Sequence, residues 1–406
     1  MRSASRLLAP RVGVKGGLRR FGEAGIVQAR RLHHLGGGDE DEEGSGVFGG
    51  DKRLDGVGGG GVGFGDMILN RFVLSGAALV VIGFGLDVRG GDHVVYEGGE
   101  GVGKGKHVVL LAGDEEYRSE ESLPMLGQLL SKHHGFKSTV CFSLNEAGEI
   151  DPKAGGSLSH PESLDSADAI VMLLRFRYWD DATMKRFQAA LDRGVPVIAL
   201  RTSTHAFNPP KEGAWGKWAW NDESGGWGKK VLGETWVSHW GKHKFEATRS
   251  VAEAGAEKSA LLRGVGEIFG DSDVYEAHPP EDVKVLLRGQ VVAGMTPESG
   301  AAEQSKKTVK GVEQPVNEPM MPIAWTRELK NEAGTVNRVF CTTMGAATDL
   351  VDEDLRRLVV NGVFWGLGLE VPEKADVTLV NSYEPSKYGF DGFKVGVKPE
   401  VFEMKE

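Results

Sequence analysis

Two histidines in one short segment are the side chains of this sequence best suited to acid–base chemistry. His239 and His243 lie four positions apart in the segment HWGKH, and an imidazole exchanges protons near neutral pH and can also ligate a metal. On a helix this spacing would place both rings on one face, but Gly241 and the strand-like flanks argue against a helix. The simplest interpretation is a structural pair. The functional interpretation is one catalytic or ligating histidine rather than a formed zinc site, and we assign no metal and no cofactor.

Further candidates follow three apolar runs, residues 107–112, 169–174 and 195–200, each of which ends in a polar turn. In chain order, we predict Asp114, Glu116 and His205 as catalytic residues, and Tyr117, Arg118, Arg175, Arg177, Arg201 and Thr202 as substrate-binding residues. Arginine offers forked donors that suit an oxygen-rich ligand. The alternatives are that the acids complement a helix dipole and that the arginines pair with them. Ser203 and His205, two positions apart, cannot by themselves form a nucleophile–base pair.

The three turns need a scaffold that brings them together, and the pattern around them indicates an α/β domain. The apolar runs are typical of strands buried on both faces of a parallel sheet. Helical spacing separates them, with Ser119 placed as an N-cap and a second helix expected over 181–193. Ligands of such sheets bind outside the carboxyl ends of the strands, so the three turns should meet at one crevice.

Residues 208–245 interrupt this alternation with an aromatic-rich insertion that holds six of the nine tryptophans. Tryptophan rings near a crevice suit stacking on the C–H faces of a sugar, and we predict Trp236 and Trp240 as substrate-binding residues. The alternative is a small core belonging to the insertion itself.

The remaining chain returns to the sheet. Strands are expected at 285–292, 323–328 and 336–343, with a polar and lid-like loop at 296–318. Asp352 should cap a final amphipathic helix, and residues 376–406 should form a tail that packs along the surface.

Composition excludes several classes of protein. A formal charge of -10 gives no reason to expect a nucleic-acid partner. The two cysteines, Cys141 and Cys341, are far apart and form neither a zinc finger nor a thioredoxin-like motif. The expected partner is a small carbohydrate, and a homo-oligomer is left open.

The first part of the chain differs from the rest in composition, because residues 1–106 hold 29 of the 59 glycines. Residues 1–66 are Gly-rich and charged, and we expect them to be disordered, or to lie upstream of the true start if Met67 is the initiator. Residues 67–90 resemble a signal peptide or an anchor, because an uncharged apolar run at 72–86 follows Arg71. This predicts a secreted, periplasmic or envelope-anchored protein held through 67–86. Residues 91–105 are expected to be a linker.

Six segments together resemble the ThuA-like, or trehalose-utilisation, proteins of the class I glutamine amidotransferase-like superfamily. They are VVLLAGDEEYRSEESLPML at 108–126, VMLLRFR at 171–177, VPVIALRTSTHAF at 195–207, LGETWVSHWGKH at 232–243, PIAWTREL at 322–329 and RVFCTTMGAATDL at 338–350. The set is most similar to a planctomycete-type subgroup and defines a domain over 106–375. The resemblance implies a flavodoxin-like, doubly wound and mostly parallel sheet that carries the Trp-rich insertion.

The sequence also departs from these relatives. Arg201 stands where the amidotransferase branch carries its cysteine, and no His-x-Glu follows, so hydrolysis of glutamine through a thioester is excluded. ThuA-like relatives have a Gly-His after the late strand, whereas this chain has Gly345-Ala346. We expect a protein that binds a carbohydrate or polyol and acts on it as a hydrolase or lyase without a cysteine nucleophile. The alternatives are a non-catalytic sugar-binding or scaffold module and a metal-dependent hydrolase using His239 and His243.

Overall fold

A ten-stranded sheet organises the computed structural model, which describes residues 91–404. Its centre is five parallel strands in the order β3-β2-β4-β5-β14, and antiparallel strands extend it at both edges. In sheet order the strands are β1 (His93–Tyr96), β3 (Lys137–Phe142), β2 (His107–Gly113), β4 (Ala169–Leu174), β5 (Val197–Leu200), β14 (Val336–Thr342), β13 (Met321–Lys330), β10 (Val283–Val292), β7 (Ala247–Ala252) and β8 (Phe269–Gly270). The predicted α/β class and parallel centre are confirmed.

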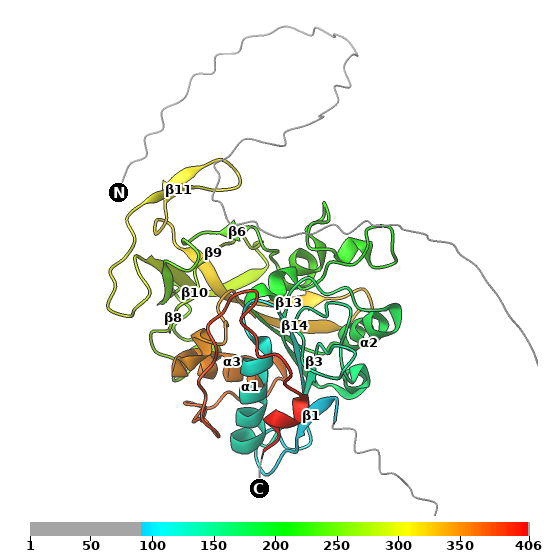
Figure 1. Ribbon diagram of the computed structural model, residues 1–406. Helices are drawn as coiled ribbons and strands as arrows, with labels where there is room; N and C mark the ends of the chain where they lie inside the picture. The colour runs from blue at the N-terminus through cyan, green and yellow to red at the C-terminus, as the bar shows by residue number, and fades with distance from the viewer. Residues whose placement is uncertain (1–90, 405–406) are drawn as a thin grey trace, which may run out of the picture. The chain divides into compact units, whose positions relative to one another are not determined.

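Helices cover both faces of this sheet. The helices α1 (Ser119–His134) and α3 (Glu353–Gly366) lie on one face and α2 (Asp181–Asp192) on the other (Figure 1). Strand β2 shows why both faces must be covered: Val108 and Leu110 join one apolar cluster, whereas Val109 and Leu111 join the opposite one. Successive side chains of a strand point to opposite faces, so a strand of continuous apolar residues is stable only between two helical layers. The sheet is therefore doubly wound, as predicted.

The helix ends are set by local polar groups. Asp352 caps α3 as predicted, since its carboxylate accepts from the backbone N–H groups of Asp354 and Leu355 at 2.9 and 3.0 Å. The predicted cap of α1 is wrong. Ser119 is already helical, its hydroxyl accepts from the backbone N–H of Asp114, and the residue before the helix is Arg118 in a left-handed conformation with φ 59°.

The predicted linker at 91–105 is also wrong at its start. Strand β1 pairs antiparallel with β3, and both Val94 and Tyr96 are buried. The Tyr96 hydroxyl donates to the carbonyl of Phe402 at 2.8 Å. Two inward apolar residues are enough to join an edge of a sheet, but they are too few to stand out among the glycines that surround them. The predictions for 1–66 and 67–90 lie outside the described residues. Within the described part of the chain, none of the helices is long and apolar enough to span a bilayer.

The 296–318 loop contains a small hairpin of β11 (Ser305–Lys307) and β12 (Glu313–Pro315), and β11 lies at the top of Figure 1. Its base is fixed to the insertion, because the Trp240 indole N–H donates to the carbonyl of Val316 and Lys306 Nζ donates to the carbonyl of His239. A second small ladder joins β6 (Ser238–His239) to β9 (Tyr275–Glu276). Short helices occupy Pro161–Ser166, Arg201–His205, Gly216–Trp218, Gly228–Leu232, Ala260–Leu262, Asp349–Val351 and Pro399–Phe402.

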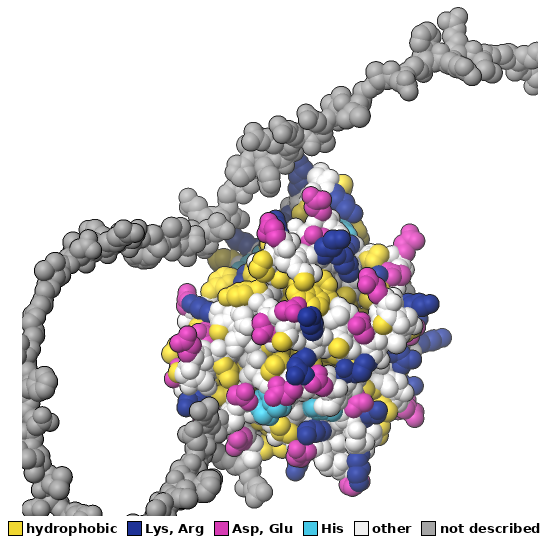
Figure 2. All heavy atoms as spheres, turned by 90° about the vertical axis from the view of Figure 1, so that its right-hand side faces the viewer, with side chains coloured by type: hydrophobic (Ala, Val, Ile, Leu, Met, Phe, Trp, Pro, Cys, Tyr) yellow, Lys and Arg dark blue, Asp and Glu magenta, His cyan; other side chains and the backbone are white. Residues whose placement is uncertain are grey.

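The C-terminal tail packs along the domain surface, as predicted. Val377 is buried, and the Phe402 ring stacks on Phe142 with centroids 6.0 Å apart. The tail runs beside α1 and α3 in Figure 1 and ends near β1. On the face drawn in Figure 2, acidic and basic side chains alternate around smaller apolar patches.

Candidate functional site

The turns that follow β2, β4 and β5 meet at one edge of the sheet, as the sequence predicts. Glu115 of the first turn pairs with Arg175 and Arg177 of the second, at 2.8 Å for Arg177. Thr202 of the third turn donates its hydroxyl to the carboxylate of Asp114. Because parallel strands bring their carboxyl ends to the same edge, residues distant in the chain form one bonded group there.

Arg201 is the centre of this group, and it does not serve the predicted role of substrate binding. The residue is 1% exposed and adopts a left-handed φ of 42°. One of its terminal nitrogens donates to the carbonyls of Asp273 and Thr343, at 2.6 and 2.7 Å. The other donates to Asp273 Oδ1 at 2.8 Å and to the Tyr117 hydroxyl at 3.1 Å. The guanidinium also lies 3.7 Å from the centroid of the Tyr275 ring. Because its terminal donors are bonded within the protein, Arg201 holds residues of the site in place and has no terminal nitrogen left for a ligand.

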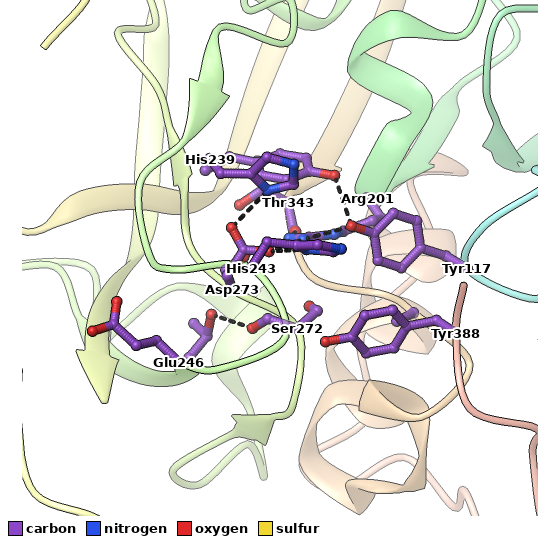
Figure 3. Close-up of polar contacts among 12 residues, drawn as sticks. Tyr117, Arg201, His239, His243, Glu246, Ser272, Asp273, Thr343 and Tyr388 are labelled. Atoms are coloured by element: carbon purple, nitrogen blue, oxygen red, sulfur yellow. Dashed lines mark hydrogen bonds and ion pairs between the residues drawn. The ribbon is translucent and has the colours of Figure 1, made fainter. Parts of the chain in front are cut away.

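The buried carboxylate of Asp273 is the partner that sequence reasoning missed. Besides Arg201, it accepts from His239 Nδ1 at 2.9 Å and from His243 Nδ1 at 3.0 Å (Figure 3). Burial alone would raise the pKa of Asp273, but the charge of Arg201 and the hydrogen bonds from both histidines hold that pKa far below its usual value. One permanently ionised carboxylate therefore orients two imidazole rings.

His243 is bonded at both ring nitrogens, because its Nε2 lies 3.1 Å from Glu116 Oε1. Burial would lower the pKa of His243, but the hydrogen bonds to Asp273 and Glu116 outweigh burial and raise it. Burial would likewise raise the pKa of Glu116, and the hydrogen bond and charge of His243 together with Arg175 and Arg201 lower it instead. The opposite shifts of these two pKa values favour the charged form of each group, and the contact between them supports both.

His239 differs from His243 in having one bonded nitrogen. The carboxylate of Asp273 fixes the proton on Nδ1, and Nε2 makes no hydrogen bond to any of residues 91–404. The side chain is 35% exposed, against 22% for His243. Its ring centroid lies 4.5 Å from that of His243 and 5.8 Å from that of Trp236. His239 therefore presents a ring nitrogen without a hydrogen bond from the described residues, on the more exposed of the two imidazoles.

The same residues fit a metal ion only in part. His239, His243 and Asp273 each offer a ligand atom, and these atoms lie within 4.8 Å of one another. However, Asp273 is already neutralised by Arg201, and the histidine nitrogens nearest to it are the ones that bond its oxygens. A cation at that point would have to displace these bonds and lie beside a guanidinium, so the arrangement fits proton transfer better than metal binding.

Asp114, which the sequence suggested as an acid or base, supports the backbone instead. Its Oδ1 accepts from the backbone N–H groups of Glu116 and Tyr117, and its Oδ2 accepts from Thr202. The side chain is fully buried, and burial, followed by the charge of Glu115, raises its pKa to about 6. Asp114 shapes the turn that carries Glu116 and makes no direct contact with either histidine.

Two other predicted ligand-binding arginines also have structural roles. Arg177 is 2% exposed and donates to Glu115 and to the carbonyl of Pro152. Arg118 is fully buried and donates to the carbonyl of Gly389 in the tail. The sequence predicted correctly at which edge of the sheet these arginines lie. Their guanidinium groups are buried, however, and are therefore not exposed at the surface of the site.

His205 forms part of the wall. It is 3% exposed, and burial, followed by the charges of Arg175 and Arg201, lowers its pKa well below the usual range, so the ring is neutral. Its ring centroid lies 5.6 Å from that of Trp236. This neutral ring beside His239 makes no contact with a carboxylate, and the predicted catalytic role is not supported.

The sequence allowed two interpretations of the tryptophans in the insertion, a surface that stacks on a sugar and a small apolar core. Different tryptophans agree with each. Trp236 lies beside His239, and Trp220 packs against Trp236 with ring centroids 5.9 Å apart; both tryptophans are partly exposed. Trp227 packs against Phe187 and other aromatic rings of the apolar cluster under α2. Trp240, predicted to bind substrate, is 1% exposed and its indole N–H is bonded to the carbonyl of Val316, so the ring belongs to the apolar core.

The C-terminal tail completes the site, which the sequence did not predict. The Tyr388 ring lies 5.2 Å from Tyr117 and 5.8 Å from His243, centroid to centroid. Figure 3 shows Tyr388 and Tyr117 side by side. The next residue, Gly389, donates its backbone N–H to the carbonyl of Glu116 at 2.8 Å. Ala346, which replaces the histidine expected from the resemblance, packs in the same small cluster as Tyr117 and Tyr388.

Phe390 follows on the tail and forms an outer wall. Its ring is 44% exposed, and the Arg175 guanidinium lies 5.0 Å from its centroid and 4.3 Å from that of Phe176. Arg175 keeps 18% of its side chain exposed. Of the predicted ligand-binding arginines, Arg175 keeps the largest exposed share of its side chain.

Comparison with known proteins identifies the family of this chain. Putative ThuA-like proteins from Parabacteroides merdae and Bacteroides uniformis are similar at 13% and 15% identity, with TM-scores of 0.41 and 0.40, covering 74% and 66% of this chain and 99% and 94% of theirs. A glutamine amidotransferase from Methylobacillus flagellatus is similar at 12% identity and a TM-score of 0.30, over 66% of this chain and 97% of its own. A search of curated proteins found no match. Residues 107–366 match the model of the ThuA family, described as trehalose utilisation, and the chain belongs to that family.

Proposed function

We propose that this protein is an acid–base enzyme of sugar catabolism that acts on a carbohydrate as a lyase or hydrolase without a covalent protein nucleophile. The observation that carries the proposal is the shared carboxylate of Asp273, which bonds Nδ1 of both His239 and His243. It leaves Nε2 of His239 without a hydrogen bond from the described residues and holds His243 between two carboxylates, those of Asp273 and Glu116. The two histidines thus have different partners, which suits one to accept a proton and the other to donate one.

In this mechanism His239 is the general base. Its Nε2 takes a proton from the substrate, either from a carbon beside a carbonyl group or from an attacking water. The imidazolium that forms is stabilised by Asp273, whose ionised state is secured by Arg201. This is the role that a buried aspartate plays toward its histidine in hydrolase triads.

His243 and Glu116 hold the proton that is returned. The proton shared between His243 Nε2 and Glu116 passes to the oxygen of the leaving group as its bond to carbon breaks. The pair then recovers a proton from His239 through solvent. In an elimination the C–H and C–O bonds break and a C=C bond forms; in a hydrolysis the hydroxyl of water replaces the leaving oxygen.

The carbohydrate class is supported by the family description and by the residues that border the histidines. Trp236 and Phe390 are partly exposed aromatic rings on two sides of the site, and Arg175 adds exposed donors between them. Aromatic faces pack on the C–H surfaces of sugars, and a few placed donors select their hydroxyl groups.

The experiment that tests this function is a panel of disaccharides and keto-disaccharides incubated with the full chain, with products detected by mass spectrometry. We expect turnover of at least one sugar. We also expect His239→Gln to lower kcat by about 10² to 10⁴ fold, the usual contribution of a positioned base. His205→Gln is the matched control, since His205 lies nearby without a carboxylate partner.

Two outcomes would reject the assignment. Sugars that shift the melting temperature without being converted would indicate a non-catalytic binding module. Equal activity in the wild type, His239→Gln and Glu116→Gln would show that the groups named here are not the acid and base.

A metal-dependent hydrolase is the second candidate, and the proximity of ligand atoms in His239, His243 and Asp273 favours it. The wild type and the doubly substituted His239→Ala/His243→Ala chain should be compared by metal analysis after purification. A stoichiometric ion that is lost in the double variant and restores activity to chelated wild type would replace the acid–base proposal.

We further propose that the protein is exported or envelope-bound through residues 67–86, on the basis of the apolar run that follows Arg71. Fractionation of cells that express the full chain, compared with a chain that starts at residue 91, tests this. Equal recovery of both in the cytoplasmic fraction would reject it.

A further inference from the structure

A second group of metal-ligating side chains lies at the outer edge of the sheet, well away from the candidate site. We call Asp92, His93, His160 and Glu162 the edge cluster. Asp92 Oδ1 lies 2.6 Å from His93 Nδ1, and Glu162 Oε1 lies 3.0 Å from His160 Nδ1. The two imidazole rings stack with centroids 3.7 Å apart and planes only 4° from parallel. Ligand atoms of Asp92, His93 and His160 all lie within 4.8 Å of one another.

The fold brings these residues together from separate segments. His93 begins the edge strand β1 and pairs with Cys141 of β3. His160 ends the connection that leaves β3 and precedes the short helix Pro161–Ser166, and its carbonyl accepts from Cys141 Sγ at 3.7 Å. Both histidines are therefore held over the same position of β3. His160 has a left-handed φ of 44°, an uncommon conformation for a residue with a side chain.

The edge cluster combines two carboxylates with two imidazoles, Asp92 lying against His93 and Glu162 against His160. A single divalent ion among these groups would be coordinated by ring nitrogens and would balance the charge of both carboxylates. Imidazole and carboxylate together form a ligand set typical of zinc and similar divalent transition metals.

We propose that the edge cluster binds one divalent cation of the zinc class through His93, His160 and Asp92, with Glu162 orienting His160 or providing a fourth ligand. The stacked rings must splay for both to direct a nitrogen lone pair at one ion. They are free to do so, since the side chains of His93 and His160 are 22% and 30% exposed. The ion would fasten the edge strand β1 to the connection between β3 and β4.

This site is independent of the proposed catalytic group. Four strand spacings separate β1 from β5, the strand that precedes Arg201. At about 4.8 Å per spacing the two groups are roughly 19 Å apart, too far to share an ion. Occupation of the edge cluster therefore says nothing for or against the acid–base mechanism.

The test is zinc binding by the full chain after chelation and dialysis. Isothermal titration with zinc chloride should be run on the wild type, on His239→Ala/His243→Ala and on His93→Ala/His160→Ala, with magnesium chloride as a control that the nitrogen ligands should not favour. We expect one equivalent in the first two proteins and its loss in the third. The melting temperature should rise with zinc in the same two proteins and stay constant in the third.

A measurement on the wild type guards against misfolded variants. Diethyl pyrocarbonate acylates accessible imidazoles, and peptide mass mapping reads each histidine separately. Zinc should protect His93 and His160 more than His107, a histidine outside the cluster. The proposal is overturned if the equivalent of zinc disappears in His239→Ala/His243→Ala, or if it persists in His93→Ala/His160→Ala. It is also overturned if zinc leaves the acylation of His93 and His160 unchanged.

Discussion

The parallel and antiparallel halves of the sheet contribute different things to the candidate site. Turns at the ends of the parallel strands supply Arg177, Arg201 and Asp114, which are buried and bonded within the protein. The segments around β6 and β9, on the antiparallel side, supply His239, His243 and Asp273. The parallel half thus forms a rigid frame, and the proton-exchanging side chains reach it mainly from the insertion. Glu116 is the exception, since it lies on a parallel turn and contacts His243.

Asp273 connects the frame to the insertion, so a substitution of this residue is expected to have the largest effect. Asp273→Asn leaves the Arg201 charge buried without its carboxylate, which should cost about 3 to 5 kcal/mol of unfolding free energy. Both histidines also lose their orienting group, so kcat should fall by about 10³ fold or more. Urea denaturation and sugar turnover measure the two effects.

Asp271→Asn is the control for this change, because its carboxylate accepts from Thr348 and does not touch either histidine. A loss of about 1 kcal/mol is expected for it. Similar losses in the two variants would contradict the central position of Asp273.

Two tryptophans of the insertion sharpen the same comparison. Trp227 is 1% exposed and packs in the apolar cluster under α2, so Trp227→Ala should lower the unfolding free energy by about 3 to 5 kcal/mol. Trp236→Ala should leave stability nearly unchanged and raise KM by about fivefold, as expected for the loss of a stacking contact worth about 1 kcal/mol. Thermal unfolding measures the effect of each substitution on stability, and substrate titration measures its effect on KM. The reverse pattern would show that Trp227, and not Trp236, contacts the substrate.

The His243–Glu116 pair predicts a dependence of stability on pH. The pKa of His243 is raised by folding, so its contribution is fully present below the unfolded pKa of about 6.5 and is lost as the pH rises through the folded value. The stability difference between the wild type and His243→Gln should therefore be largest in acid and shrink in alkali. Urea unfolding of both proteins from acidic to alkaline pH measures this stability difference. A difference that grows with pH would show that His243 is neutral in the folded protein.

The smallest expected effect concerns the tail. The Tyr388 hydroxyl donates to the carbonyl of Asp271 at 2.9 Å, so Tyr388→Phe should cost about 1 kcal/mol. The ring stays in place beside His243, and KM should change less than threefold. Tyr388→Ala removes the ring as well and should alter KM more. Equal effects of the two variants on KM would mean that the ring does not border the substrate.

The sequence was most informative where apolar periodicity is strong. Strands β2, β4 and β14 and the cap at Asp352 follow from local patterns, because burial on both faces requires a continuous apolar run and a helix start requires a side-chain acceptor. The edge at which polar turns meet also follows, since the carboxyl ends of parallel strands share it.

The roles of the polar residues could not be predicted in this way. Arg201 and Arg175 follow strands in the same manner, yet Arg201 is fully buried and Arg175 is partly exposed. What decides between them is Asp273, more than 70 positions from Arg201, and no local pattern relates the two. The acidic and aromatic residues of 271–276, which include Asp273 and Tyr275, were the available signal. Strand β1 was missed for a different reason, because two inward apolar residues are too few to form a pattern.

The bond from Gly389 to the backbone of Glu116 has a consequence for how the protein should be handled. The family match ends at residue 366, whereas this contact lies 23 positions further on. A recombinant fragment trimmed to the matched boundaries would keep every strand from β2 to β14, together with Asp273, Arg201, His239, His243 and Glu116. It would nevertheless lack Tyr388, whose ring lies beside His243, and the bond from Gly389 that ties the tail to Glu116. Inactivity of such a fragment would report on where the gene was cut rather than on the chemistry of the family.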